Sequence, residues 1–401
     1  MNQTIINDEL VIDQRGFARK TNEIADLGAV ESDVAQFIVD TLVDEDDGDY
    51  SPGDRSLREM IALSPDGGTI IFDASLANQT ITLGGTELLV DKSLTIDGAT
   101  HNITIDANYQ SNVFNLDDGD NNSLSDIVIE GLNIVNPNII DPRRSAGIYS
   151  RENFTLRNVE VTGNQWNGII NAFSSNILAN TVVIENSNIY NNNTFNLDGA
   201  GFINLNQANI TITNSQFTNN LLRAFYNTAN NINLTISNSD FTNNQLGIYL
   251  PSGENAIVHI SNSRFNDSDI ISDKASSNVT IDNTVMSNNV VALSNSGNMI
   301  VTNSLIYNNT NIFGTAGLFN SGNLQIINTT ISNNSGHLNN IGNQGILTIL
   351  NSTIADNSSF YAIDNKGTLN ITSSIISGHT SGRNGRIINN TGTATSAAWW
   401  K

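Results

Sequence analysis

Residues 210–220 read ITITNSQFTNN and residues 234–244 read LTISNSDFTNN, and this repeated phrase decides the fold. In each copy, apolar residues alternate with Thr or Ser, which is the period-two pattern of a strand with one buried face. An Asn then interrupts the alternation, and Asn accepts the left-handed backbone of a tight bend more readily than most residues do. Each phrase therefore predicts two short strands that meet at a corner.

The phrase occurs eleven times between residues 127 and 379. Its corner positions span 242 residues in ten steps of 20 to 28, so one repeat takes about 24 residues. A repeat of this length without a helical stretch is typical of a parallel β-solenoid, whose stacked coils share one core. The corner positions are Gly131, Asn158, Asn186, Asn214, Asn238, Asn262, Asn283, Asn303, Asn328, Asn351 and Ser373.

We therefore predict an all-β chain that forms a right-handed parallel β-helix, a single-stranded solenoid of the pectate-lyase-like type with about eleven coils plus an N-terminal cap. The expected organisation has four parts. Residues 1–36 are the tail of a preceding module or a linker, 37–126 an acidic cap with the first coils, 127–380 the repeats, and 381–401 a C-terminal tail.

The composition excludes several classes of protein. The 401 residues include 39 acidic and 17 basic side chains, no Cys, and 67 Asn. The absence of Cys excludes disulfide scaffolds and zinc–cysteine sites, and the net charge of −22 leaves no basic surface for nucleic acid. No apolar run approaches the roughly 18 residues of a membrane-spanning helix. Residues 1–126 contribute −19 of the charge (25 acidic against 6 basic), so the repeats are nearly neutral.

The Asn pairs that end most phrases have two interpretations. They form amide ladders at the corners, where identical side chains bond to the coils above and below, or they present hydrogen-bonding groups to sugar hydroxyls. The sequence favours the ladders.

The acidic region resembles a known domain. A strand at Phe37 to Leu42 leads into an acidic loop, then Ser56-Leu57-Arg58-Glu59 and a short helix around Leu57 to Leu63, and strands follow at Thr69 to Asp73 and Leu94 to Gly98. This order is similar to the CSLREA domain that opens many bacterial surface proteins built of right-handed β-helix repeats. The name-giving Cys of the domain is Arg55 here. The resemblance, over residues 37–106, implies an extracellular or cell-surface location.

A second resemblance lies further upstream. DQRGFAR at 13–19 and IADLGAVES at 24–32 are similar to the end of a choice-of-anchor region, which normally closes such a module. The chain is thus expected to be a piece of a longer tandem protein, and its first residues do not have the pattern of a signal peptide.

Two acidic clusters are candidate metal sites. The loop 44–49 offers Asp44, Asp46, Asp47 and Asp49 on a Gly-containing turn, and Ca²⁺ prefers six to eight oxygen ligands of this kind. The second cluster is Asp117-Asp118-Gly119-Asp120. The alternative for both is a solvated acidic loop.

An enzyme is the alternative function, because β-helices also carry polysaccharide lyases and glycoside hydrolases. Asp141, Arg143, Arg144 and Arg151 form the one mixture of acid and Arg within the repeats, and they are the candidate residues of a calcium-dependent lyase or hydrolase. The four His residues lie far apart in the sequence and in no catalytic frame.

The favoured function is therefore non-catalytic: an adhesin-like stalk or a carbohydrate- or partner-binding surface of a secreted or cell-surface protein. The expected partners are a surface polysaccharide or another copy of the chain, bound through the solenoid ends.

Overall fold

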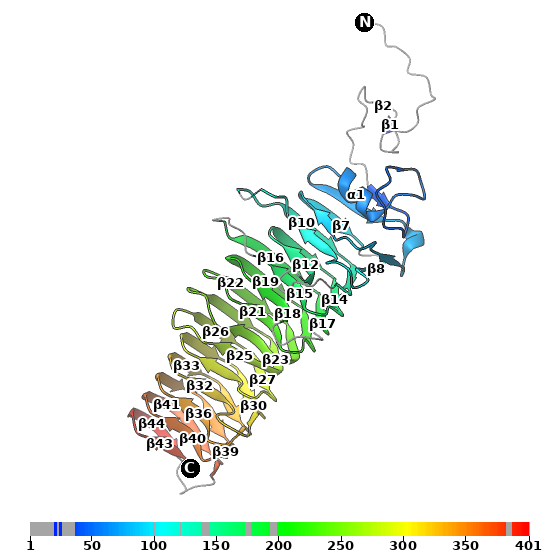
Figure 1. The fold of residues 1–401 in the computed structure, drawn as a ribbon. Helices are drawn as coiled ribbons and strands as arrows, with labels where there is room; N and C mark the ends of the chain where they lie inside the picture. Colours follow the sequence, from blue (N-terminus) through cyan, green and yellow to red (C-terminus); the bar gives the residue numbers. More distant parts are fainter. Residues whose placement is uncertain are drawn as a thin grey trace.

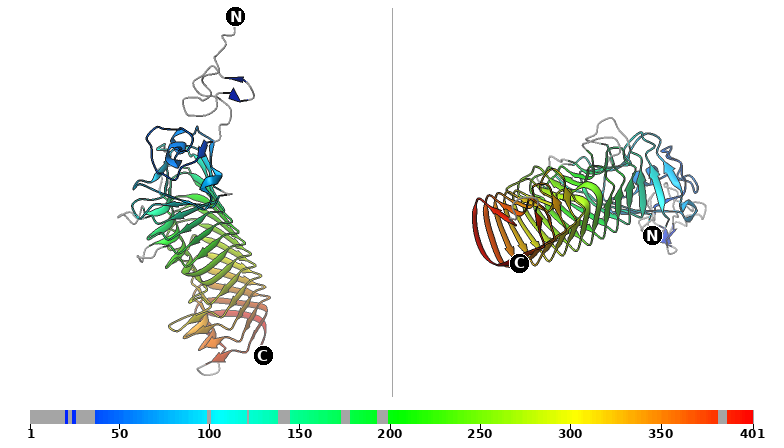
Figure 2. Two further views of the ribbon diagram at one scale, coloured as in Figure 1. Left: turned by 90° about the vertical axis from the view of Figure 1, so that its right-hand side faces the viewer. Right: turned by 90° about the horizontal axis from the view of Figure 1, so that it is seen from below.

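The computed structural model describes residues 20–21, 24–25, 37–98, 101–120, 122–137, 145–172, 178–192, 199–381 and 387–400. The chain forms a parallel β-helix of about 13 turns, which confirms the predicted solenoid. The coils stack into a rod with the acidic cap at one end (Figures 1 and 2). The count exceeds the predicted eleven because the coils within 68–125 and the last coil, near 388–400, lack the Asn-Ser phrase.

Three parallel sheets run along the rod, and most coils give one strand to each. The first sheet contains β3 (Phe37–Val39), β4 (Gly68–Phe72), β7 (Leu94–Asp97), β10 (Asp126–Glu130), β13 (Asn153–Arg157), β16 (Asn180–Glu185), β19 (Ala208–Thr213), β22 (Asn233–Ser237), β24 (Ile257–Ser261), β26 (Asn278–Asp282), β29 (Asn298–Thr302), β33 (Asn323–Ile327), β37 (Ile346–Leu350) and the starts of β41 (Thr368–Ser377) and β44 (Thr393–Trp400).

The second sheet follows the Asn corner. It contains β5 (Thr80–Thr82), β8 (Ile103–Asp106), β11 (Leu132–Val135), β14 (Glu160–Thr162), β17 (Asn188–Tyr190), β20 (Gln216–Thr218), the starts of β23 (Asp240–Leu250) and β25 (Arg264–Ser272), β27 (Val285–Ser287), β30 (Leu305–Tyr307), β34 (Thr330–Ser332), β38 (Thr353–Ala355) and the ends of β41 and β44.

The third sheet closes each coil. It contains β6 (Leu88–Val90), β9 (Phe114–Leu116), β12 (Ala146–Ser150), β15 (Asn167–Asn171), β18 (Ala200–Asn204), β21 (Arg223–Asn227), the ends of β23 and β25, β28 (Leu293–Asn295), β32 (Leu318–Asn320), β36 (Asn339–Asn343), β40 (Tyr361–Asn365) and β43 (Ile388–Asn390).

Smaller elements complete the chain. A short sheet of β31 (Thr310–Asn311), β35 (Ser335–Gly336), β39 (Ser358–Ser359) and β42 (Thr380–Ser381) lies beside the last coils. Strands β1 (Lys20–Thr21) and β2 (Ile24–Ala25) pair antiparallel. The helices are α1 (Leu57–Leu63) and the 3₁₀ turn η1 (Ala74–Leu76). Neither is long and apolar enough to cross a membrane, and no other helix occurs in the residues that the structure describes.

The corner prediction is confirmed at all eleven positions. From Gly131 to Ser373 each corner residue has a positive φ, between 45° and 66°. Alternate residues then point inward into one continuous core. Within it Phe217, Phe241 and Phe265 stack on successive coils, with ring centroids 5.0 and 4.6 Å apart.

The Asn ladders also exist, and the ladder interpretation holds for the second Asn of each pair. The buried Asn192 Nδ2 donates to Asn220 Oδ1 on the next coil (2.9 Å) and to the Val161 carbonyl (3.0 Å). Asn220 Nδ2 repeats the pattern with Asn244 (3.1 Å). A buried amide is costly unless it is bonded, so these side chains join the coils rather than face solvent.

A second ladder follows the end of the third sheet. Its central member, the buried Asn320, accepts from Asn295 Nδ2 (2.8 Å). Its own Nδ2 donates to Asn343 Oδ1 (2.8 Å), the Ile346 carbonyl (3.0 Å) and the Gly322 carbonyl (3.1 Å). One side chain therefore satisfies buried polar groups on both neighbouring coils.

The cap covers the first coil with α1. Ser56 caps the helix in a capping box with Glu59, as an S-x-x-E sequence before an apolar run favours. Leu57, Met60 and Ile61 are buried, and α1 packs on β3 and β6. The predicted helix at Leu57 to Leu63 is confirmed.

Two predicted segments lie partly outside the described residues. Most of the tail 1–36 does so. The predicted C-terminal tail 381–401 contains β43 and β44. Strand β43 pairs with β40 and β44 pairs with β41, so these two strands continue the solenoid.

Replacing Asn320 with Ala should lower the free energy of unfolding by about 2–4 kcal/mol, because several buried groups on adjacent coils lose their partner. The matched control is Asn233→Ala, since Asn233 is exposed and bonds Asn209 across the outer surface (2.8 Å). That change should cost no more than about 0.5 kcal/mol. Denaturant unfolding measures both, and equal losses would contradict the importance of the buried ladder.

Candidate functional site

The third sheet carries a column of outward side chains. In each of its strands one residue lies between two inward-facing neighbours, and strand pairing places these residues one above another about 4.8 Å apart. We call this set the outward column. Its members are Leu89, Asn115, Tyr149, Ile170, Ile203, Tyr226, Tyr249, Ile271, Ser294, Phe319, Gly342, Asp364 and Asn389.

The column is apolar and aromatic over its central part. Tyr149 and Ile170 belong to a small buried cluster that is separate from the solenoid core. Tyr226 and Tyr249 stack with centroids 5.6 Å apart and planes 13° apart. The Arg223 guanidinium lies 4.4 Å from the first ring and 5.4 Å from the second, which is a cation–π arrangement. Burial raises the pKa of the Tyr249 hydroxyl, and the charge of Asp273 raises it further.

Two adjoining hollows follow toward the C-terminal coils. The first, the Tyr249 hollow, has a volume of about 410 Å³ and is lined by Tyr249, Asp273 and Phe319, among others. The second, the Gly342 hollow, has a volume of about 270 Å³. Both include Thr315 and Phe319, so the two hollows adjoin, and we call the pair the groove; it extends over β23, β25, β28, β32, β36 and β40.

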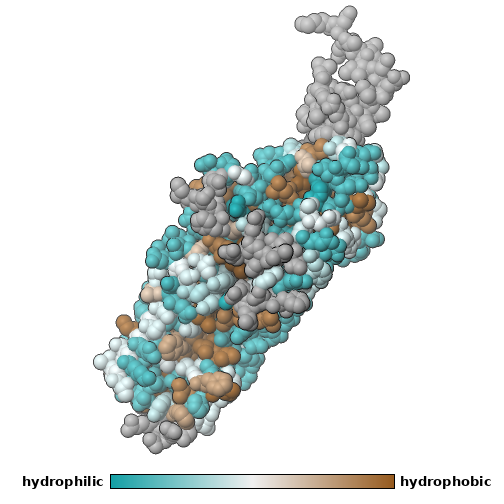
Figure 3. Space-filling model, in the orientation of Figure 1, coloured by the Kyte–Doolittle hydropathy of each residue, from teal (hydrophilic) through white to brown (hydrophobic). Residues whose placement is uncertain are grey.

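Exposed apolar side chains flank this groove. Ile312 and Phe313 are 69 % and 83 % exposed, and Leu338 is 46 % exposed. Asn311 holds their loop, because its Oδ1 accepts from the backbone of Phe313 (3.0 Å) and its Nδ2 donates to the Thr315 carbonyl (2.9 Å). Apolar patches are visible among polar surface on the C-terminal half of the rod (Figure 3).

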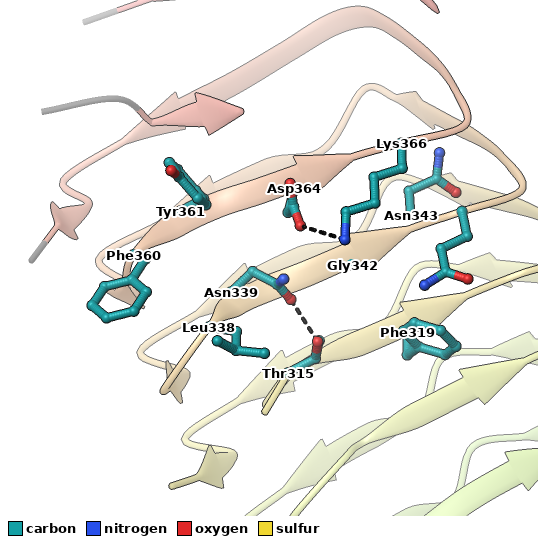
Figure 4. Close-up of a pocket in the computed structure, with 11 residues that line it drawn as sticks. Thr315, Phe319, Leu338, Asn339, Gly342, Asn343, Phe360, Tyr361, Asp364 and Lys366 are labelled. Atoms are coloured by element: carbon teal, nitrogen blue, oxygen red, sulfur yellow. Dashed lines mark hydrogen bonds and ion pairs between the residues drawn. The ribbon is translucent and has the colours of Figure 1, made fainter. Parts of the chain in front are cut away.

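The Gly342 hollow also contains polar groups (Figure 4). Asp364 Oδ1 accepts from Asn389 Nδ2 (2.7 Å), and its Oδ2 lies 3.8 Å from Lys366 Nζ. On the opposite side, the Thr315 hydroxyl donates to Asn339 Oδ1 (2.5 Å). Hydroxyl, amide, carboxylate and ammonium groups thus converge within one hollow that also has aromatic walls.

Several carboxylates of the predicted acidic loop bind other groups of the chain, both inside and outside the loop. Asp44 binds Arg58 through both carboxylate oxygens (2.8 and 2.9 Å). Asp47 and Asp49 each accept a backbone N–H two residues ahead, and Asp46 is exposed. In the described part of the chain no group of three or more Asp, Glu, His or Cys is arranged to hold a metal. Calcium in this loop stays a prediction.

Of the residues in the enzyme hypothesis, Asp141, Arg143 and Arg144 lie outside the described residues. Arg151 is described, and it pairs with Asp117 of the second acidic cluster (2.9 Å). This ion pair links two adjacent coils.

Glu152, which the sequence did not single out, lies next to this pair. Its side chain is buried and accepts backbone N–H groups of Ser125 (2.8 Å) and Asp118 (3.3 Å). Burial raises the pKa of Glu152 to about 7, with Asp118 and Asp117 adding to the effect. Burial likewise raises the pKa of Asp269 to about 7, although that carboxylate accepts backbone N–H groups of two Val residues.

The outward column was also missed from the sequence. A signal was available, because the third-sheet strands share a short pattern with an outward Ile or Tyr in fourth place: AGIYS, NGIIN, AGFIN, RAFYN and LGIYL, at 146–150, 167–171, 200–204, 223–227 and 246–250. This pattern recurs in fewer coils than the Asn phrase, so it was not recognised as a repeat of its own.

No known protein-family model matches the sequence, and no curated protein matches it. Solved structures do match the fold. The chain is similar to pectate lyase Pel9A (16 % identity, TM-score 0.35, covering 91 % of this chain and 83 % of that one). It is also similar to the A-module of mannuronan C-5 epimerase AlgE4 from Azotobacter vinelandii (15 %, 0.44, 83 % and 91 %). A third similar structure is tailspike protein 3 of bacteriophage CBA120 (11 %, 0.48, 90 % and 60 %). At these identities the likeness concerns the fold alone.

Glu152 should make stability depend on pH. Its folded pKa lies above its ordinary value of 4.5, so the unfolded carboxyl ionises first and stability falls as the pH rises from about 4.5 to about 7 and slightly beyond. Glu152→Gln should therefore reduce the drop in melting temperature between pH 5 and 8, because Gln does not ionise in either the folded or the unfolded state. The variant should keep part of the drop, because the pKa of the buried Asp269 is raised in the same way.

Glu254→Gln, which changes an exposed carboxyl, is the control and should keep the full drop. Thermal melts across this pH range measure the effect. A melting temperature that rises with pH, or an unchanged profile in Glu152→Gln, would contradict this role for the buried carboxyl.

Proposed function

We propose that the chain is a non-catalytic, polysaccharide-binding repeat protein that holds a glycan along the groove of the third sheet. The observation that carries the proposal is the pair of adjoining hollows that share Phe319. Aromatic rings offer large apolar faces, on which the C–H face of a sugar can pack. Amides, hydroxyls and a carboxylate beside them can bond the sugar hydroxyls.

The groove has the length and rigidity that a polymer needs. From Tyr249 to Asp364 the outward column makes five steps, which is about 24 Å at ~4.8 Å per strand. Hydrogen bonds between Asn side chains on successive coils fix the strands at this spacing. A rigid groove binds with less loss of entropy than one that must order on binding.

The carboxylates of the groove argue against hydrolysis. Asp273 follows β25 and Asp364 lies on β40, four steps along the sheet, which is roughly 19 Å. Glycoside hydrolases place two carboxyl groups about 5 to 10 Å apart. The two acids that line the hollows therefore do not form a catalytic pair.

The alternative is a calcium-dependent lyase or hydrolase that uses Asp141, Arg143, Arg144 and Arg151. Arg151 is the described member, and it forms an ion pair with Asp117 (2.9 Å). This reading predicts product formation, so an assay separates it from binding.

The extracellular or cell-surface location rests on the resemblance of residues 37–106 to the CSLREA domain. We further propose that copies of the chain associate through the ends of the solenoid, as stacked repeats can.

Affinity electrophoresis in gels that contain laminarin, galactomannan, polygalacturonate or alginate tests the proposal. At least one polymer should retard the native chain without new reducing ends or unsaturated uronate. Tyr249→Ala and Phe319→Ala should weaken that binding about tenfold each, since truncating an aromatic anchor of a binding surface costs more than about 1 kcal/mol. Tyr307→Ala, on the second sheet, is the matched control and should bind normally.

Absence of retardation by every polymer would remove the binding proposal. Calcium-dependent cleavage of polygalacturonate or alginate would favour the alternative instead.

A further inference from the structure

The outward column has one position without a side chain. Gly342 lies between Phe319 on β32 and Asp364 on β40, in register with both. We propose that Gly342 forms the floor of a primary subsite for one neutral sugar unit, which deepens the binding function proposed above and rests on it.

The backbone does not require glycine at this position, because Gly342 is not in the left-handed region. An added Cβ would lie 3.1 Å from Thr315 Oγ1, 3.2 Å from Asn339 Oδ1 and 3.3 Å from Phe319 Cδ2. These distances are tighter than ordinary Cβ contacts, so Thr315, Asn339 and Phe319 crowd around Gly342 and would have to shift to admit a larger side chain. The hollow of about 270 Å³ lies near the lower limit of ligand pockets, ~300 Å³, which suits one ring rather than an oligosaccharide.

Phe319 and Thr315 lie on one side of Gly342, and Asp364 and Lys366 lie on the other (Figure 4). Phe319 offers a ring face, with Leu338 and Phe360 at the margin. Across Gly342, the Asp364 carboxylate accepts one hydrogen bond from Asn389, and a carboxylate has about four acceptor sites. A sugar ring with its C–H face on Phe319 would direct its hydroxyls toward the free acceptor sites of Asp364.

The charges favour a neutral sugar. Among the residues that line the two hollows, Lys366 is the one cation, and it faces Asp364. Asp273 adds a second negative charge to the other hollow, where the Arg223 guanidinium lies 5.4 Å from the Tyr249 ring. A polyuronate would bring further carboxylates past Asp273 and Asp364, and Lys366 is the one cation that lines either hollow, so the like charges disfavour its binding.

The test compares two variants on the same polymers. Gly342→Val fills the floor, and Asp364→Asn removes the charged acceptor but keeps an oxygen for Asn389. Laminarin or galactomannan should retard the native chain more strongly than polygalacturonate does. Each variant should weaken binding of the retained neutral polymer at least tenfold, with the melting temperature of Asp364→Asn unchanged.

The controls are Ser332→Val and Asp282→Asn, on the second and first sheets, which should bind as the native chain does. If Tyr249→Ala weakens binding while Gly342→Val and Asp364→Asn bind normally, the proposal of a subsite at Gly342 fails, but the proposal of glycan binding along the groove survives. Stronger retention by polygalacturonate than by the neutral polymers would overturn the neutral class alone. If the native chain binds none of the polymers, both proposals fail. If Gly342→Val unfolds, Asp364→Asn decides.

Discussion

Hydrogen bonds between identical amides on successive coils are the constraint on which the rest of the structure depends. A solenoid coil must turn sharply three times, and each turn leaves backbone N–H and C=O groups that the strands cannot pair. Asn192, Asn220 and Asn320 supply both a donor and an acceptor at such turns, so each coil satisfies the next. This explains why one residue in six is Asn in a chain that has few charges and no Cys.

The ladders also determine what the outside of the rod can present. Once the amides fix the register, every outward position on the third sheet lies directly above its equivalent on the previous coil. Side chains at these positions form a row along the sheet, and a glycine in the row leaves room for a hollow. Tyr226 with Tyr249 illustrates the first case and Gly342 the second. The function we propose uses this property, since a row of rings and polar groups at fixed spacing suits a polymer.

The acidic cap plays a different physical part. Its carboxylates are largely engaged in structure: Asp44 with Arg58, Asp40 with Arg55, and Glu59 with the start of α1. The cap covers the apolar end of the first coil and carries most of the net charge. Like charges on the cap repel one another, whereas the long body is nearly neutral. The site for a neutral ligand thus lies many coils away from the strongest negative potential.

The sequence by itself determined the solenoid, because period-two strands, corner Asn residues and a repeat of about 24 residues are local patterns. It also determined the corner positions and α1, which depend on the conformational preferences of single residues and on one capping box. The tertiary structure alone decided the groove. Coils differ in length, so the sequence separations between Phe319, Gly342 and Asp364 or between Asp117 and Arg151 carry no fixed meaning. Only the stacking of one coil on the next, held by buried hydrogen bonds, places those residues side by side.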